Sequence, residues 1–484
     1  MTHKINPKSR KPVQNNLFVM SPLFLVMFFY ILLVGSGSGD QHGTTTQYYT
    51  KLADAFLDGN LHLTRIGKDI PIDLSFYEGK FYIYWGPVPA LILVPIQFFF
   101  RKPVGDFFLA FTFGTGILLA QSLLLLAVWN RYFNSLPKWT IYLSILLGGL
   151  TEPIIFLRHN YDHARIYQAA IGGGQFFLMS GLLMAFTTIT KPSISNWRHA
   201  SAGLLWALAI GSRHILAAPI GFMAMLTAFL LVKTNADFIA KTAKLISLGL
   251  PLALGFAVLG WYNWARFDSI TETGFSYALA GVNIREHSTE LFSQVYIIQN
   301  LYNYLLNPPG LISNFPFISM RDGIETPILS FYTVPEFYHA EPMTGLLYIF
   351  PFAVFAIVPL ITLFLNLFKE KSAKTLLGGN GHRLPAWIVL NLGGSILIAF
   401  GLLMGFFWVG IRYLGDFIPP LTVLSALGFW QGYRSPVRRP LAQNLYILSG
   451  IILASSSILI STLLAISTNS GLIDLIIHSF PDLR

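Results

Sequence analysis

A carboxylate stands in this chain where the first long apolar run ends. Asp40 follows the linker "GSGSG", which comes directly after the apolar run Leu17 to Val34. A carboxylate in such a position could accept a proton from a reacting hydroxyl group, as a general base. It could equally cap a helix or close a turn, for which a connection rich in glycine and serine is well suited. Asp40 alone is compatible with both roles.

A basic pair interrupts a second apolar stretch. Arg213 and His214 lie in the middle of the 32 residues from Ser201 to Val232. Basic loops flank this stretch on both sides, so it must cross a membrane an even number of times, and two short helices turning near Gly211 fit its length. A charge at membrane depth costs about 2.5 to 3.5 kcal/mol, so the Arg213 side chain either reaches the lipid headgroups or faces a polar cavity. In the second case it would bind an anion in a cavity open to the outer side.

A third charged site lies late in the chain, in "WVGIRYLGDFIPPL". Arg412 and Asp416 are four residues apart, which places both on one face of a helix. The spacing therefore predicts an ion pair between them that needs no ligand. The alternative is that Arg412 binds an anion and Asp416 supports it.

A short polar loop between two apolar runs carries the densest group of candidate side chains. The loop "LRHNYDHAR", residues 157 to 165, contains Arg158, His159, Asp162, His163 and Arg165. Two histidines and an aspartate could bind a metal ion, although their spacing is not a specific metal signature. The cluster could also bind an anion or form a solvated, hydrogen-bonded loop.

One acid lies close to this loop. Glu152 precedes Pro153 near the end of the preceding apolar run. We expect a hydrogen-bonded structural acid there in preference to a catalytic one.

The composition indicates that the elements carrying these residues lie in a membrane. Hydrophobic residues make up 54% of the 484 residues and charged residues only 11%, and the mean hydropathy is +0.58. These values predict an all-α polytopic membrane protein with a single membrane domain, residues 1–484. The net charge of +10 is spread over short segments, which argues against a nucleic-acid partner. Cysteine is absent, so the chain forms no disulfide and no thiolate binds a metal.

The apolar runs predict about eleven transmembrane helices, each joined to the next by a polar loop. The loops on the side of the N-terminus carry 18 lysines and arginines against two acids, and the rest of the chain has 14 basic and 20 acidic residues. By the positive-inside rule, the leader 1–16 is cytoplasmic and the tail 467–484 lies outside, in a plasma (inner) membrane. The expected spans are 17–34, 106–129, 138–157, 167–189, 201–212, 214–232, 243–261, 343–366, 385–407, 414–430 and 443–466.

Two outer loops stand out by their length. The first outer loop, residues 35–105, contains the apolar run 88–100, which is too short and too rich in proline to cross the membrane. We expect it to lie on the outer surface as an interfacial helix, anchored by Tyr82, Tyr84 and Trp85. The large outer loop, residues 262–342, also carries many aromatic residues, which suit either an interfacial belt or the face of a sugar ring. The belt is the preferred interpretation.

In this arrangement the chain resembles the GT-C membrane glycosyltransferases, a superfamily that includes the protein O-mannosyltransferases and the aminoarabinose transferases of lipid A. The resemblance is carried by the order of several segments and by no single motif. These segments are a first span that ends in an acid, the loop sequences "QYYTKLADAFLDGNLHL" and "DLSFYEGKFYIYWGPVPALILVP", the turn "AIGSRH" and the late "RYLGDFIPP". Asp40 is followed by Gln41 and His42, where a second acid would complete a carboxylate pair.

The resemblance implies transfer of a sugar from a polyprenyl-phosphate donor to a glycan, lipid or protein acceptor at the outer face. It implies that the first-loop acid, here Asp40, acts as base or positions the acceptor, and we expect Asp162 as the second acid. Arginine binds phosphate oxygens with its planar fork, so the candidate donor-binding residues are Arg213, Arg412, Arg158 and Arg165. The expected supporting residues are His42, His159, His214 and Asp416. No cofactor is required on this interpretation, and a divalent metal has no sequence support.

Two other classes of protein remain open. A transporter or lipid flippase would also place arginines in a cavity at membrane depth, but an inverted repeat would be expected, and the spans show none. A noncatalytic partner in the assembly of surface glycans would tolerate the loss of Asp40, whereas an enzyme would not.

Overall fold

A computed structural model describes most of the chain. The described residues are 21–35, 47–66, 73–101, 104–157, 166–190, 196–233, 237–279, 284–329, 333–369, 384–435 and 440–480.

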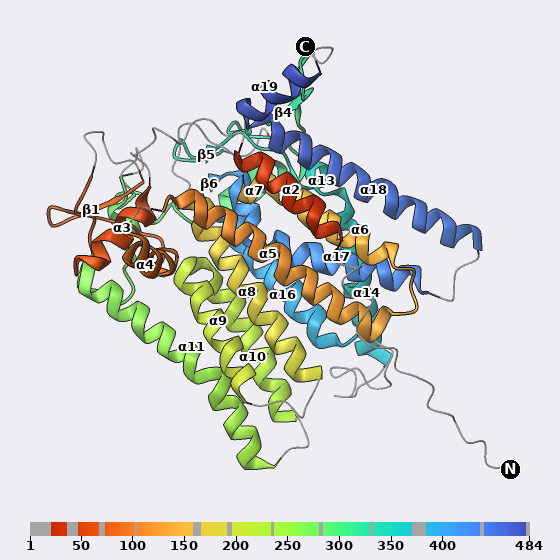
Figure 1. The fold of residues 1–484 in the computed structure, drawn as a ribbon, viewed down its shortest axis with the longest axis horizontal. Coiled ribbons are helices and arrows are strands. Elements are labelled where there is room, and N and C mark those ends of the chain that lie inside the picture. The colour runs from red at the N-terminus through yellow and green to blue at the C-terminus, as the bar shows by residue number, and fades with distance from the viewer. Residues whose placement is uncertain are drawn as a thin grey trace.

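The described residues form a bundle of long apolar helices, with shorter elements gathered at one end of it (Figure 1). Within this part of the chain, seven helices are long and apolar enough to cross a membrane. The helices of the bundle are α2 (Pro22–Gly35), α5 (Asp106–Val128), α6 (Trp139–Thr151), α8 (Ile166–Thr190), α9 (Trp197–Ser212), α10 (Ala217–Lys233), α11 (Phe238–Phe267), α14 (Ile357–Lys369), α16 (Ala386–Met404), α17 (Ile418–Tyr433) and α18 (Pro440–Ser467). The helical membrane fold predicted from the sequence is confirmed.

Several expected spans have different ends or are interrupted. The span expected at 343–366 is divided into α13 (Leu346–Ile349), the 3-10 helix η6 (Pro351–Ala356) and α14. The span expected at 414–430 begins as a separate 3-10 helix, η7 (Ile411–Asp416), because α17 starts only at Ile418. Helix α11 continues to Phe267, well beyond the expected 261.

Helix α8 lies inside the bundle and packs against α5 and α9, and α9 in turn packs against α11. Glycines permit the closest of these approaches. At Gly203 of α9, a Cβ atom would lie 2.1 Å from the carbonyl oxygen of Leu248 in α11. At Gly181 of α8, a Cβ atom would likewise lie 2.5 Å from the indole ring of Trp206 in α9. Small residues at such contacts let helices pack closely in a membrane, where the hydrophobic effect contributes little.

The first outer loop folds into two helices and a hairpin. These elements are α3 (Tyr48–Leu57), β1 (Ser75–Tyr77), β2 (Lys80–Tyr82) and α4 (Val88–Phe100), and β1 pairs with β2 in antiparallel register. The first turn of helix α3 contacts the carboxylate of Asp106. This carboxylate accepts hydrogen bonds from the backbone N–H groups of Tyr49 (3.1 Å) and Thr50 (2.9 Å). A negative charge at this end satisfies free N–H groups and favours the helix dipole. The first outer loop is therefore tied to the start of α5.

The aromatic residues before α4 were expected to anchor it at the membrane surface, and for two of them this is wrong. Tyr82 and Trp85 are buried, with 6% and 4% of their surface exposed. The Trp85 ring packs edge-on against Tyr167 of α8, and the Tyr82 ring packs against Phe267 of α11. Contacts inside the protein remove these side chains from the lipid interface. The exposed aromatic residues of α4 are instead at its far end, from Phe98 to Phe100.

The large outer loop is held in place by short elements. Strand β5 (His339–Ala340) pairs in parallel with β6 (Trp408–Val409), which directly precedes η7. This pairing brings the end of the loop next to Arg412. The other elements between 262 and the bundle are η3 (Phe275–Tyr277), η4 (Gln294–Tyr296), α12 (Ile297–Leu301), the π-helix η5 (Tyr302–Leu306), β3 (Gly310–Leu311) and β4 (Ile318–Ser319).

Three further short helices lie elsewhere in the described part of the chain. They are η1 (Trp129–Phe133), a π-helix that continues α5, α7 (Pro153–Phe156), and α19 (Ser470–Ser479) in the expected C-terminal tail. The side chain of Asn469 donates to the carbonyl of Leu33 at 2.7 Å. This bond joins the ends of α2 and α18.

Candidate functional site

The turn predicted near Gly211 is present, and it places Arg213 between two helices. Helix α9 ends at Ser212, Arg213 is extended (φ −142°, ψ 99°), and the 3-10 helix η2 (His214–Leu216) leads into α10. The Arg213 guanidinium forms a bidentate pair with Asp416, through Nε to Oδ1 at 3.0 Å and Nη2 to Oδ2 at 2.8 Å. These two bonds leave Nη1 for a ligand.

The predicted pair between Arg412 and Asp416 is wrong. The prediction assumed an α-helix, but residues 411–416 form a 3-10 helix with three residues per turn, so positions four apart point in different directions. Arg412 instead pairs with Glu341 of the large outer loop, and Nη1 donates to Oε2 at 2.6 Å and also to Oε1. Asp416 binds Arg213, so the two arginines have separate carboxylate partners.

Aromatic rings surround Arg412. Its guanidinium lies 4.0 Å from the ring centre of Tyr167 and 4.8 Å from that of Tyr413. Its Nη2 donates to the Tyr413 hydroxyl at 3.3 Å. Its Nε is buried and has no hydrogen-bond partner within the described ranges. The charged Arg412 guanidinium therefore lies against two aromatic rings and keeps one N–H donor without a partner among the described residues.

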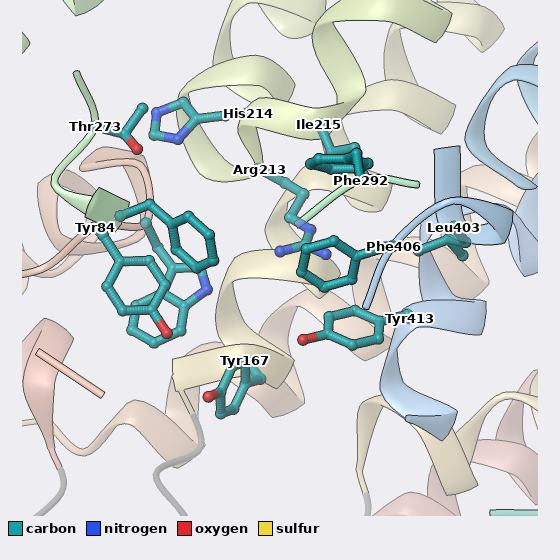
Figure 2. Close-up of a pocket in the computed structure, with 12 residues that line it drawn as sticks. Tyr84, Tyr167, Arg213, His214, Ile215, Thr273, Phe292, Leu403, Phe406 and Tyr413 are labelled. Atoms are coloured by element: carbon teal, nitrogen blue, oxygen red, sulfur yellow. The ribbon is translucent and has the colours of Figure 1, made fainter. Parts of the chain in front are cut away.

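A cavity of about 180 Å³ opens beside Arg213. Figure 2 shows Arg213 at its centre, with the phenol oxygens of Tyr84, Tyr167 and Tyr413 turned toward the space between their rings. The first outer loop, the turn between α9 and α10, the large outer loop and the α16 to η7 segment all contribute to its walls. The lining residues are Tyr84, Trp85, Tyr167, Arg213, His214, Ile215, Thr273, Phe275, Phe292, Leu403, Phe406 and Tyr413.

His214 also lines this cavity, on a different side from the Arg213 guanidinium. Figure 2 shows its ring directed toward Thr273, away from the Arg213 guanidinium. Its Nε2 is buried, and the described part of the chain offers it no hydrogen-bond partner. Such an atom is a free donor or acceptor for a bound molecule. Arg213 and His214 thus line the cavity, Asp416 pairs with Arg213, and Arg412 lies against the lining residues Tyr167 and Tyr413. Their roles in binding or catalysis remain predictions.

The other predicted site residues lie outside the described residues. They are Asp40, His42, Arg158, His159, Asp162 and Arg165. Their roles remain predictions. Helix α8 begins at Ile166, directly after the last four of these positions in the sequence, and its Tyr167 lines the cavity.

Glu152 has the structural role expected of it. Its carboxylate accepts hydrogen bonds from Gln121 Nε2 at 3.2 Å and from Thr422 Oγ1 at 3.3 Å. These bonds join α5 and α17 to the end of α6.

Several residues of the site have no sequence signal of their own. Glu341 reaches Arg412 only because β5 pairs with β6, across 71 positions of sequence. Its carboxylate also accepts a hydrogen bond from Trp408 Nε1 at 2.7 Å. Tyr84, Tyr167 and Tyr413 are three of 21 tyrosines. Of these three tyrosines, only Tyr413 could have been suspected from the sequence, because it directly follows Arg412.

The comparisons with known proteins support the fold. The structure is similar to the apo crystal structure of the oligosaccharyltransferase of Archaeoglobus fulgidus, with a TM-score of 0.54 and 14% sequence identity. The match covers 94% of this chain but 56% of the other, so this chain spans little more than half of that protein's length. No protein-family model and no curated protein sequence matches the chain. The fold expected from the resemblance to the GT-C membrane glycosyltransferases is thus confirmed.

Proposed function

We propose that the chain is a glycosyltransferase that moves a sugar from a polyprenyl-phosphate donor to an acceptor at the outer face of the membrane. The observation that carries this proposal is the cavity in which Arg213 lies among aromatic rings, with Arg412 directly behind them. The fold is consistent with it, because the similar solved structure is that of an oligosaccharyltransferase.

The cavity has the two kinds of surface that a sugar phosphate needs. The Nη1 of Arg213 can donate to phosphate oxygens, and the positive charge of Arg412 lies behind the rings of Tyr167 and Tyr413. The rings of Phe275, Phe406 and Tyr413 offer apolar faces to a sugar. The carboxylates of Asp416 and Glu341 hold the two guanidinium groups in fixed orientations, so a ligand meets donors that are already placed.

In the proposed reaction, an acceptor hydroxyl attacks the anomeric carbon and the bond from that carbon to the phosphate oxygen breaks. The phosphate leaves with the bonding electron pair, and the two arginines stabilise its growing negative charge. A base takes the proton of the hydroxyl, and the predicted base is Asp40. The sequence gives no reason to require a cofactor for these steps.

A comparison of cells with and without the protein tests the proposal. We expect one polyprenyl-phosphate sugar to accumulate in cells that lack the protein, and one surface glycan, glycolipid or glycoprotein to lose that sugar. Mass spectrometry of extracted lipids and of surface glycans measures both changes. Unchanged lipid-linked sugars would contradict the proposal. A donor that is made normally but stays on the inner leaflet would favour a flippase instead.

A further inference from the structure

Two polar side chains line the cavity on a different side from the Arg213 guanidinium. They are His214 of the turn between α9 and α10, and Thr273 of the large outer loop. Figure 2 shows the His214 ring directed toward Thr273. The described residues give neither the buried His214 Nε2 nor the Thr273 hydroxyl group a hydrogen-bond partner. Since buried polar groups in native proteins are nearly always paired, these two groups indicate a place where a ligand binds.

The backbone around Thr273 is fixed by several hydrogen bonds. The Glu272 carboxylate accepts one from the Gly274 N–H at 2.6 Å, and Ser75 Oγ of β1 donates to the Gly274 carbonyl at 2.7 Å. The Arg266 guanidinium donates to the Thr273 carbonyl at 3.4 Å. The Thr273 hydroxyl group is therefore presented to the cavity from backbone that has little freedom to move.

His214 is fixed by the turn that also carries Arg213. The Leu216 N–H donates to the Arg213 carbonyl at 3.1 Å, and the Ala217 N–H donates to the His214 carbonyl. The imidazole and the guanidinium are thus neighbours on one short, hydrogen-bonded turn. A ligand held by Arg213 meets His214 in a fixed relative position.

The two sides of the cavity suit different parts of a ligand. Arg213 offers N–H donors and positive charge, which suit a phosphate. An imidazole nitrogen donates or accepts a hydrogen bond according to its tautomer, and a threonine hydroxyl group does both. A sugar hydroxyl group also donates and accepts, so it matches the pair formed by His214 and Thr273.

The space between these two sides suits one sugar ring. A cavity of about 150 Å³ can hold a benzene ring, and the volume here is about 180 Å³. Its wall also has aromatic rings beside Thr273. Tyr84 stacks on Trp85 with 3.8 Å between ring centres, and Phe275 packs edge-on against Tyr84 at 5.5 Å. These rings offer apolar surface to the carbon skeleton of a sugar.

We propose that His214 and Thr273 bind a hydroxyl group of the transferred sugar and thereby determine which sugar the protein accepts. This assignment rests on the proposed function and adds to it a sugar-binding subsite next to the phosphate-binding Arg213. The hydroxyl group bound here is not the one that reacts. It keeps its hydrogen throughout the transfer, so it makes no demand on the predicted base.

Two substitutions test the subsite, and a third is their control. His214→Phe removes both ring nitrogens but keeps a planar ring, and Thr273→Val removes the hydroxyl group but keeps the branched shape. Thr271→Val is the matched control, because Thr271 lies in the same loop, is exposed and does not line the cavity. The probes are polyprenyl monophosphate and polyprenyl-phosphate-linked glucose, mannose, allose and galactose. The last three sugars each differ from glucose in the direction of a single hydroxyl group.

Affinity for each probe and the melting temperature are measured in one detergent. We expect the unaltered protein to bind one of the four sugar donors at least about tenfold tighter than another, because a site built for a hydroxyl group rejects a sugar that misplaces it. His214→Phe and Thr273→Val should each lower this preference at least about threefold, the effect of losing one hydrogen bond.

The same two variants should bind polyprenyl monophosphate within about twofold of the unaltered protein, because that probe has no sugar to contact the subsite. Their melting temperatures should not fall, since each loses a polar group that has no partner among the described residues. Thr271→Val should match the unaltered protein in every measurement.

Equal affinity of the unaltered protein for all four sugar donors would overturn the subsite while leaving the proposed function intact. So would an unchanged preference in either variant, or a loss of polyprenyl monophosphate affinity that equals the loss for the sugar donors. If one variant fails to fold, the other decides, because each alone must separate sugar preference from phosphate binding. Failure of the unaltered protein to bind polyprenyl monophosphate would overturn the proposed function, and the subsite with it.

Discussion

At the scale of single residues, the site depends on how its two arginines are neutralised. Only 13% of the Arg213 side chain and none of the Asp416 side chain is exposed, so this pair is nearly dry. Removing one partner of such a pair costs about 3 to 5 kcal/mol, because the other charge is left buried without compensation. A loss of activity after removal of either charge would therefore report folding as well as binding.

Arg213→Lys separates the two effects. Lysine keeps the positive charge next to Asp416, so we expect normal expression and a melting temperature close to that of the unaltered protein. Lysine lacks the planar fork, so one ammonium group cannot hold Asp416 and a phosphate as arginine does, and we expect about tenfold weaker binding of polyprenyl monophosphate. Arg213→Gln should lose both stability and binding. Equal phosphate affinity for the lysine variant and the unaltered protein would show that Arg213 does not touch the phosphate.

Arg213, Arg412 and Asp416 could be chosen from the sequence as candidates, but their pairing could not be predicted. Arg213, His214 and Arg412 attracted attention because a charge in an apolar stretch needs a partner or a cavity. The partner of Arg412 is set by the β5–β6 contact, and no local pattern shows that Glu341 lies across from it. Tyr84, Tyr167 and Tyr413 were missed as residues of the cavity wall for the same reason, because tertiary packing alone places them there.

At the scale of elements, the site requires the first outer loop to sit directly on the turn that carries Arg213. The closest approach is between Gly86 and Gly211, where a Cβ atom on Gly86 would lie 1.9 Å from the Gly211 carbonyl oxygen. Backbone cannot move aside as a flexible side chain can. Gly86 follows the pocket residues Tyr84 and Trp85, so any shift of this segment would move the wall of the cavity away from Arg213.

Gly86→Ala should therefore be destabilising by about 1 to 3 kcal/mol, the usual cost of overpacking, and should weaken polyprenyl monophosphate binding. Gly221→Ala is the matched control, because Gly221 lies within α10 and a Cβ atom there would meet nothing within 4 Å. The control should be neutral or up to about 1 kcal/mol more stable, since alanine favours a helix over glycine. Melting temperatures and phosphate affinities in one detergent compare the two variants. A Gly86→Ala protein as stable as the control would mean that the loop does not press on this turn.

At the scale of the whole molecule, the apolar runs predicted the helices better than their ends. Runs of the right length gave α5, α8, α10, α16 and α18 nearly as found, because a membrane span needs about 20 apolar residues whatever its neighbours. The breaks within 343–366 and at Phe417 were missed, because irregular backbone inside a helical bundle depends on contacts with other helices. The buried Trp85 shows the same limit, since an aromatic residue for the interface and one for the core look alike in sequence.

The orientation in the membrane follows from the charges of the loops and remains a prediction. It places the β1–β2 turn and the segment after η3 outside, and the turns that follow η1 and α10 in the cytoplasm. The natural absence of cysteine makes a direct test simple, because a single introduced thiol is the only one present. Exposed positions in the described turns are suitable, among them Lys80, Thr289, Ser135 and Asp237.

We expect an impermeant thiol reagent to label Lys80→Cys and Thr289→Cys in intact cells, and to label Ser135→Cys and Asp237→Cys only after the membrane is opened. In this orientation the cavity lies on the side of Lys80, whose hairpin is followed in the chain by the lining residues Tyr84 and Trp85. Since polyprenyl-phosphate sugars used outside the cell must first cross the membrane, the side of the cavity also decides on which leaflet the donor is consumed. Labelling of Ser135→Cys in intact cells, with Lys80→Cys protected, would place the reaction in the cytoplasm and remove the need for a flipped donor.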